Sequence, residues 1–154
     1  MANLPDFQVE VYDVSQKMSS VCERGQFCVY GTTGSGASVG DTNGFVKVES
    51  ANNAAISGAK FAGVVMHPHV VLDTTKFDLN QLKHEHPVSG ATTLAKKGFI
   101  VTDNISGTPT VGATAYLALS GKVSPNDLGL APVVGVFESI KDELGFAKIR
   151  FTTV

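Results

Sequence analysis

The sequence of 154 residues contains no tryptophan, only two cysteines and few charged side chains. Aspartate, glutamate, lysine and arginine make up 17% of the chain, whereas an average globular protein has about 25%. The formal net charge of -2 gives no basic field to attract nucleic acid, and the lysines and arginines form no cluster. We therefore expect no nucleic-acid partner, and a surface that is either weakly polar or covered by neighbouring proteins.

Long apolar runs are also missing. No stretch approaches the roughly 20 apolar residues of a membrane-spanning helix, and residues 1–8 show no basic region followed by an apolar core. Neither a membrane partner nor a secretory signal is expected. We therefore expect synthesis in a reducing cytoplasm, where Cys22 and Cys28 remain free thiols. The alternation of Cys28 with Phe27 and Val29 favours a small buried side chain at Cys28.

What the sequence does contain is a series of short apolar runs separated by glycine, proline, asparagine and aspartate. Residues 110–151 hold three such runs, a pattern typical of a β-meander. About nine or ten short strands are expected in all, and this spacing is typical of a barrel or a sandwich. The other predicted strands are at 7–14, 26–30, 45–49, 61–66, 92–95 and 99–102.

The predicted protein is mainly β, a small β-barrel or β-sandwich formed by residues 21–154. A domain of this size buries roughly 70% of the surface of its unfolded chain, so it needs neither a disulfide nor a metal to fold. Residues 1–20 are predicted to form an N-terminal arm. Residues 67–90 interrupt the strand pattern and are predicted to be one long irregular insertion, in which 76–83 fit either a short helix or a surface loop.

Within the arm, residues 7–14 alternate between apolar and polar side chains. This pattern predicts a half-buried strand with Phe7, Val9 and Val11 on one face. The polar residues that follow, 15–23, fit either a short helical turn or an extended connector.

The glycine-rich residues 31–44 invite comparison with a phosphate-binding loop. Gly31 and Gly36 have the glycine spacing of that motif, and Ser38 occupies its hydroxyl position. However, Ala37 stands where the motif needs the lysine that reaches the phosphates, and no helix is predicted to follow. We interpret the segment as an excursion between strands, with no cofactor.

All four histidines fall within residues 67–86, as His67, His69, His84 and His86. Residues two apart in extended chain face the same side, so each pair could present two imidazoles to one metal ion. A cupin-like, metal-dependent β-barrel enzyme is therefore the alternative hypothesis. However, this chain has Asp73 where that family has a glutamate, and no histidine follows His86 to complete the metal site. No metal site is predicted.

Other catalytic patterns are absent as well. Ser35 lies between two glycines but lacks the Gly-x-Ser-x-Gly spacing of a nucleophile elbow, and Asp142 and Glu143 are neighbours in a predicted turn without an opposing partner. A carbohydrate- or peptide-binding module is disfavoured because the chain has no tryptophan and only three tyrosines to stack on sugars. We expect no enzyme and no catalytic residues.

Several short, mostly glycine-containing motifs resemble those of the tailed-bacteriophage capsid cement (decoration) proteins. The likeness extends over roughly residues 21–72 and 91–151, whereas the N-terminal arm and the histidine-bearing insertion have no counterpart in it. The motifs are Ala-Gly-Val-Val at 62–65, Gly-Phe-Ile-Val at 98–101, Val-Gly-Ala-Thr-Ala-Tyr-Leu at 111–117, Gly-Lys-Val-Ser at 121–124 and Val-Gly-Val-Phe at 134–137.

This resemblance implies a virion structural protein with a β-barrel or sandwich core and no enzymatic activity. Such a protein is made in the host cytoplasm and then sits on the outer surface of the capsid as a homo-oligomer, a dimer or a trimer. Its partner is the major capsid protein, whose adjacent subunits it clamps together.

The segments that the core explains least, the arm from residue 4 to 14 and the loop 31–44, are the expected contacts with that partner. An arm of this kind can add a strand to the exposed edge of a neighbouring sheet, where main-chain hydrogen bonds give affinity. The residues expected to contact the partner are Leu4, Phe7, Val9, Val11, Tyr12, Ser35 and Val39.

Overall fold

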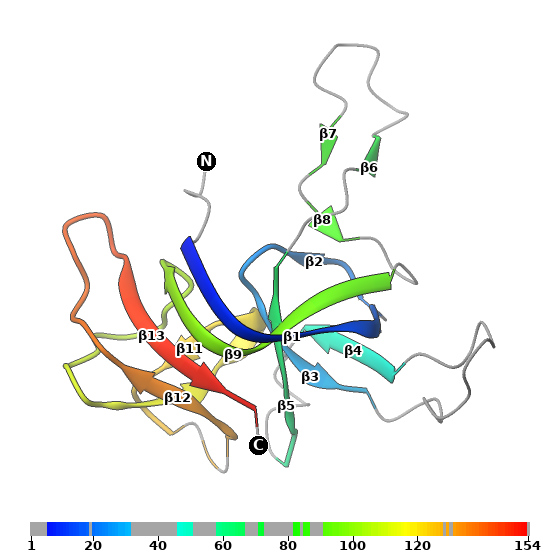
Figure 1. Ribbon diagram of the computed structural model, residues 1–154. Coiled ribbons are helices and arrows are strands. Elements are labelled where there is room, and N and C mark those ends of the chain that lie inside the picture. Colours follow the sequence, from blue (N-terminus) through cyan, green and yellow to red (C-terminus); the bar gives the residue numbers. More distant parts are fainter. Residues whose placement is uncertain are drawn as a thin grey trace.

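The computed structural model describes residues 6–18, 20–31, 46–50, 58–66, 71–72, 82–83, 85–86, 91–127, 129 and 131–153 (Figure 1). These residues form strands and one short 3-10 helix, and the predicted mainly β class is confirmed. In chain order the elements are β1 (Asp6–Met18), β2 (Cys22–Glu23), β3 (Phe27–Tyr30), β4 (Val46–Ser50), β5 (Phe61–Val65), β6 (Val71–Leu72), β7 (Leu82–Lys83), β8 (Glu85–His86), β9 (Ala91–Thr102), β10 (Thr114–Leu117), η1 (Leu119–Gly121), β11 (Val123–Ser124), β12 (Val133–Phe137) and β13 (Ala147–Thr152).

Nine strands form one sheet in the order β1-β4-β3-β5-β9-β13-β12-β10-β11, and β1 also pairs with β9. The extra pairing closes β1, β4, β3, β5 and β9 into a ring, in which only the β1–β4 pair is parallel. On the other side of β9, a bridge between Ile105 and Val123 connects the chain after β9 to β11. The predicted barrel-like architecture is therefore confirmed, with β9 shared by two rings.

Strand β9 holds the two rings together because its two edges have different partners. One edge pairs along its length with β1, while the other pairs first with β5 and then with β13. Gly98 lies opposite both Val9 and Phe151. Its φ of +151° and the closeness of the Gln8 carbonyl oxygen to the place of a Cβ explain why glycine is required there.

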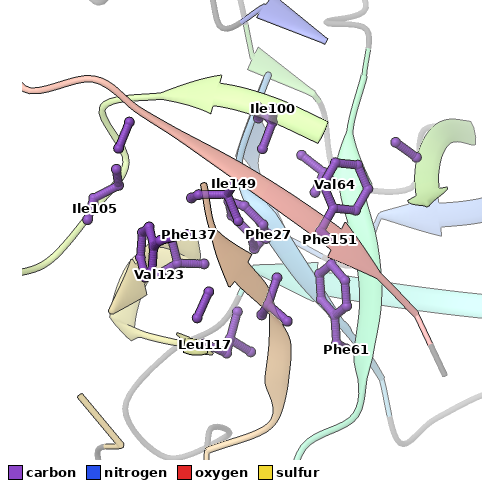
Figure 2. Packing of buried hydrophobic residues seen from close by; sticks show 14 of the residues in the cluster. Phe27, Phe61, Val64, Ile100, Ile105, Leu117, Val123, Phe137, Ile149 and Phe151 are labelled. Carbon is purple, nitrogen blue, oxygen red and sulfur yellow. The ribbon is translucent and has the colours of Figure 1, made fainter. Parts of the chain in front are cut away.

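The two rings enclose one continuous hydrophobic core (Figure 2). The rings of Phe27 in β3 and Phe61 in β5 lie with their centroids 5.9 Å apart, and Phe137 and Phe151 enter the same cluster from β12 and β13. Each such side chain contributes roughly 1.5–3 kcal/mol through its burial. A smaller cluster lies beside this core and consists of Cys22, Cys28, Ala62, Val65 and Leu94.

The N-terminal strand is longer than the pattern predicted. Strand β1 continues through the polar residues 15–18, for which the sequence left a helical turn and a connector open. The reason is a long-range one: the backbone of residues 16–18 pairs with β4 on one side, and residues 16–17 also pair with β9. Over residues 6–18, the predicted arm is thus a strand of the main sheet.

The predicted alternation within this strand fails at Val11. The register of β1 against β9 shifts between Val9 and Val11 and again between Val11 and Tyr12, which is the signature of a β-bulge. Val9 packs half-buried against the core, whereas 50% of Val11 and 66% of Tyr12 are exposed. The bulge therefore turns a residue expected to lie beside Val9 toward the solvent.

Six residues of the predicted insertion 67–90 are described, and they form three two-residue strands. Strand β6 pairs with β7, and β8 pairs with β2 beside the main sheet. Residues 82–83, within the segment that fitted a helix or a loop, are extended. Among the described ranges, no helix is long and apolar enough to cross a membrane.

Candidate interaction surface

The β1 bulge produces the most unusual exposed surface of the described chain. Glu10, Val11 and Tyr12 follow one another along β1 and are all exposed, whereas a regular strand would turn alternate side chains inward. Val11 lies directly opposite the exposed Lys97 of β9 in the register. The bulge thus places an exposed apolar side chain opposite a charged one, and the exposed Tyr12 follows it in the strand.

A row of alternating charges crosses the sheet from this point. The Lys97 Nζ atom lies 2.8 Å from the Glu10 Oε2 atom, and the Arg150 Nη1 atom lies 3.9 Å from Glu10 Oε1. Arg150 also donates from Nε to the Glu138 Oε1 atom at 2.6 Å, and Lys148 Nζ lies 3.1 Å from Glu138 Oε2. The row therefore joins β1, β9 and β13 to the residue that follows β12.

The local cause of this row is the period of two in β13. Ile149 and Phe151 point into the core, so Lys148 and Arg150 stay outside it. Val136 of β12 lies directly opposite Arg150 and is also exposed.

The ion pairs favour the charged forms of these groups. Hydrogen bonds from Arg150 and then Lys148 hold the pKa of Glu138 below its ordinary value, and the hydrogen bond from Lys97 lowers the pKa of Glu10. The Glu138 hydrogen bond in turn raises the pKa of Arg150. Exposed pairs of this kind add little to folding stability, but fixed charges of alternating sign favour one orientation of a partner over others.

A shallow hollow of about 220 Å³ lies between these side chains. Gly98 and Gly135 are among its lining residues and add no side chain to fill it. The volume is below the roughly 300–1,000 Å³ of small-molecule pockets, so it suits one side chain of a protein partner better than a cofactor. The remaining lining residues are Glu10, Lys97, Val136, Arg150, Phe151 and Thr152.

We use the name β1–β13 face for Glu10, Val11, Tyr12, Lys97, Val136 and Arg150. Its tyrosine and arginine side chains are of the types that are enriched at protein interfaces. No group of three or more potential metal-ligating side chains occurs within the described part of the chain. The arrangement can bind a protein surface, and it presents no activated nucleophile among these residues.

The predicted contact residues are only partly brought together on this face. Val11 and Tyr12 lie on it, and Val9 does not, because it packs against the core. Phe7 is in β1, where only its backbone is described. Leu4, Ser35 and Val39 lie outside the described residues.

Sequence reasoning did not name Glu10, Lys97, Val136 or Arg150 as contact residues. The alternation in residues 147–152 indicates that Arg150 faces outward, but only the strand register shows that it meets Glu10 of β1. The sequence pattern therefore predicted the direction of the Arg150 side chain, but it did not predict which residue that side chain contacts.

The alternative of a cupin-like enzyme, which would bind a metal through its histidines, stays a hypothesis. His67, His69 and His84 lie outside the described residues, as does Ser38 of the glycine-rich loop. The backbone of His86 lies opposite Cys22 in the β2–β8 pair. Cys22 and Cys28 are free and buried, which confirms the small buried side chain expected at Cys28.

Neither the known protein-family models nor the curated protein sequences contain a match to this chain. The likeness to capsid decoration proteins therefore rests on the motifs themselves.

Proposed function

We propose that this protein is a capsid decoration (cement) protein, a virion structural protein without enzymatic activity. It binds the outer surface of a bacteriophage head and stabilises the contacts between major capsid subunits, together with copies of itself. The motifs that suggest this family fall mainly on strands. The segments 62–65 and 98–101 lie in β5 and β9, and 134–137 lie in β12.

The observation that carries the proposal furthest is the exposure of Val11 and Tyr12 at the β1 bulge. Bulges are frequent where a strand redirects a side chain for function, and aromatic residues often dominate the affinity of protein interfaces. The charged row beside them supplies complementarity, because a capsid surface with carboxylates near Lys97 and Arg150 would orient the protein.

Many copies on a symmetric shell make a modest single contact sufficient. Each copy meets the same neighbours, and linked contacts raise the overall affinity without any new interaction. A face as small as this one is therefore compatible with stable decoration.

Binding to capsids tests the proposal directly. Purified protein is mixed with heads that lack it, assembled from the major capsid protein of the same phage, and co-sedimentation is measured over a range of concentrations. We expect saturable binding by the wild type and at least about tenfold weaker binding by Tyr12→Ala, a loss of about 1.4 kcal/mol. A shell that the wild type does not bind would overturn the proposal.

The control is Val111→Ala, which truncates a side chain of similar exposure, 67%, in the turn before β10. Its binding should match that of the wild type. If Tyr12→Ala and Val111→Ala bind equally well, the β1–β13 face is not the contact. Deleting residues 2–14 is a poor test, because it would remove most of a strand from the sheet.

A further inference from the structure

Cys22 and Cys28 are brought together by a tight reversal of the chain between β2 and β3. The Gln26 amide donates to the Glu23 carbonyl at 3.2 Å, and Gly25 takes a positive φ of 84°, a conformation that glycine adopts without strain. This turn places the two Sγ atoms 3.6 Å apart. Residues that sit on separate strands therefore have their sulfur atoms in contact.

The pair is held in a defined position. Both thiols are buried beside Ala62, Val65 and Leu94, and the Cys22 thiol donates to the Gln26 side-chain oxygen at 3.1 Å. The same oxygen accepts from the Glu23 amide at 3.1 Å. Gln26 thus fixes the direction of the Cys22 sulfur, and the arrangement is not that of two isolated cysteines.

In the reduced protein the Cys28 thiol is favoured over its thiolate. The hydrogen bond with Cys22 and the burial of the sulfur raise the pKa of the Cys28 thiol, although the positive charge of Lys96 opposes this. Lys96 is held nearby by a hydrogen bond of 2.6 Å to the Ala62 carbonyl. Buried thiols remain reduced during synthesis in a cytoplasm.

We infer that Cys22 and Cys28 are a built-in disulfide site that closes when the protein meets a peroxide outside the reducing cytoplasm. The exposure to an oxidising environment rests on the proposed function, because a protein bound to a phage capsid leaves the cytoplasm when the cell lyses. The sulfur contact does not depend on it. A disulfide has its sulfurs about 2.05 Å apart, so closure requires a movement of about 1.5 Å from the observed contact.

The reaction balances with hydrogen peroxide as the oxidant. One thiolate attacks a peroxide oxygen, the O–O bond breaks, and the products are a sulfenic acid and hydroxide, which takes up the proton that the thiol released and becomes water. The second sulfur then attacks the sulfenic sulfur, the S–O bond breaks, and a second water leaves with that thiol's proton. Two thiols lose two electrons and two protons in total, and the peroxide is reduced to two waters.

Closure would join β2 covalently to β3 in the barrel. Since β2 pairs with β8, the bond would also fix the point where residues 85–86 meet the barrel. The closed loop is short, and the stabilisation expected from chain entropy corresponds to a rise in Tm of roughly 5 °C.

The test uses the full chain, reduced, freed of reductant and then exposed to a small excess of hydrogen peroxide. The intact mass should fall by two hydrogens, both cysteines should resist alkylation after unfolding, and Tm should rise by about 5 °C. A dithiol reductant should reverse all three changes. This result needs no capsid, so failure of decoration and failure of disulfide formation are separate outcomes.

Single variants supply the control. Cys22→Ala and Cys28→Ala each retain one sulfur, so peroxide should add oxygen to that sulfur and leave Tm without the rise. Two variants are used in case one does not fold. Oxygen addition to both cysteines of the wild type, dimers joined through a disulfide, or a stoichiometric metal held by the thiols would overturn the inference.

Discussion

The described contacts of the two rings reach over different distances along the chain. In the ring of β9 to β13, polar side chains fix the turns: the Asp142 carboxylate accepts from the Leu144 and Phe146 amides at 2.9 and 2.8 Å. Asp127 does the same for Gly129 and Ala131 at 3.0 and 3.2 Å. The ring of β1, β4, β3, β5 and β9 includes the pairing of β1 with β9, which joins segments far apart in the sequence.

One short chain thus contains turns that are determined by neighbouring residues and strand pairs that are formed by distant residues. Turns closed by their own side chains are encoded by a few neighbouring residues. The pairing of β1 with β9 joins residues that lie 74–95 positions apart, so it costs more loop entropy and needs the shared core to form. The core contains residues from both rings, and we expect the rings to fold as one unit.

Gly98→Ala should have a large effect, because Gly98 lies where both rings meet. The added Cβ would overlap the Gln8 carbonyl oxygen and would also strain the positive φ. We expect a loss of about 4 kcal/mol in the free energy of unfolding, measured by urea denaturation. The control Gly112→Ala has a positive φ but nothing within 4 Å of the new atom, and should lose only about 1 kcal/mol. Equal losses would show that the close approach of β1 is unimportant.

Truncation of one phenylalanine in each ring tests whether the rings fold together. Phe27→Ala and Phe151→Ala remove buried rings from β3 and β13, and each should lower the free energy of unfolding by about 3–5 kcal/mol. Both variants should unfold in a single transition by fluorescence and circular dichroism. Two separate transitions in either variant would mean that the rings are independent. The exposed Val133→Ala on β12 should change stability by less than about 0.5 kcal/mol.

The smallest effect is the acid sensitivity supplied by Glu138. Its pKa in the folded protein lies below the ordinary value of 4.5, so its stabilising effect is present above that value and is lost as the pH falls through the lower, folded-state pKa. We expect Tm to fall less between about pH 7 and about pH 3 in Glu138→Gln than in the wild type.

The control for this prediction is Glu143→Gln, which removes an exposed carboxylate from the turn between β12 and β13. It should keep the acid sensitivity of the wild type. An acid response of Glu138→Gln identical to that of the wild type would show that the ion pairs with Arg150 and Lys148 do not contribute.

Much of the C-terminal ring could be predicted from the sequence. Apolar runs separated by turn residues located the meander between residues 110 and 151. In the other ring, the strand-like pattern around Cys28 indicated its burial. The candidate face was predicted only in part: Val11 and Tyr12 were named, while Lys97 and Arg150 were not. The sequence pattern does not show which residue an exposed charged side chain will pair with, because that partner depends on the strand register.

The sequence by itself determined the mainly β class, the turns that are closed by neighbouring residues and the burial of a small thiol in β3. These depend on side-chain periodicity and turn chemistry, which act over a few residues. The tertiary structure alone decided that β1 extends to Met18, that a bulge exposes Val11, and that Cys22 contacts Cys28. Each of these is set by backbone pairing or packing with other segments, and no local pattern encodes the choice between possible partners.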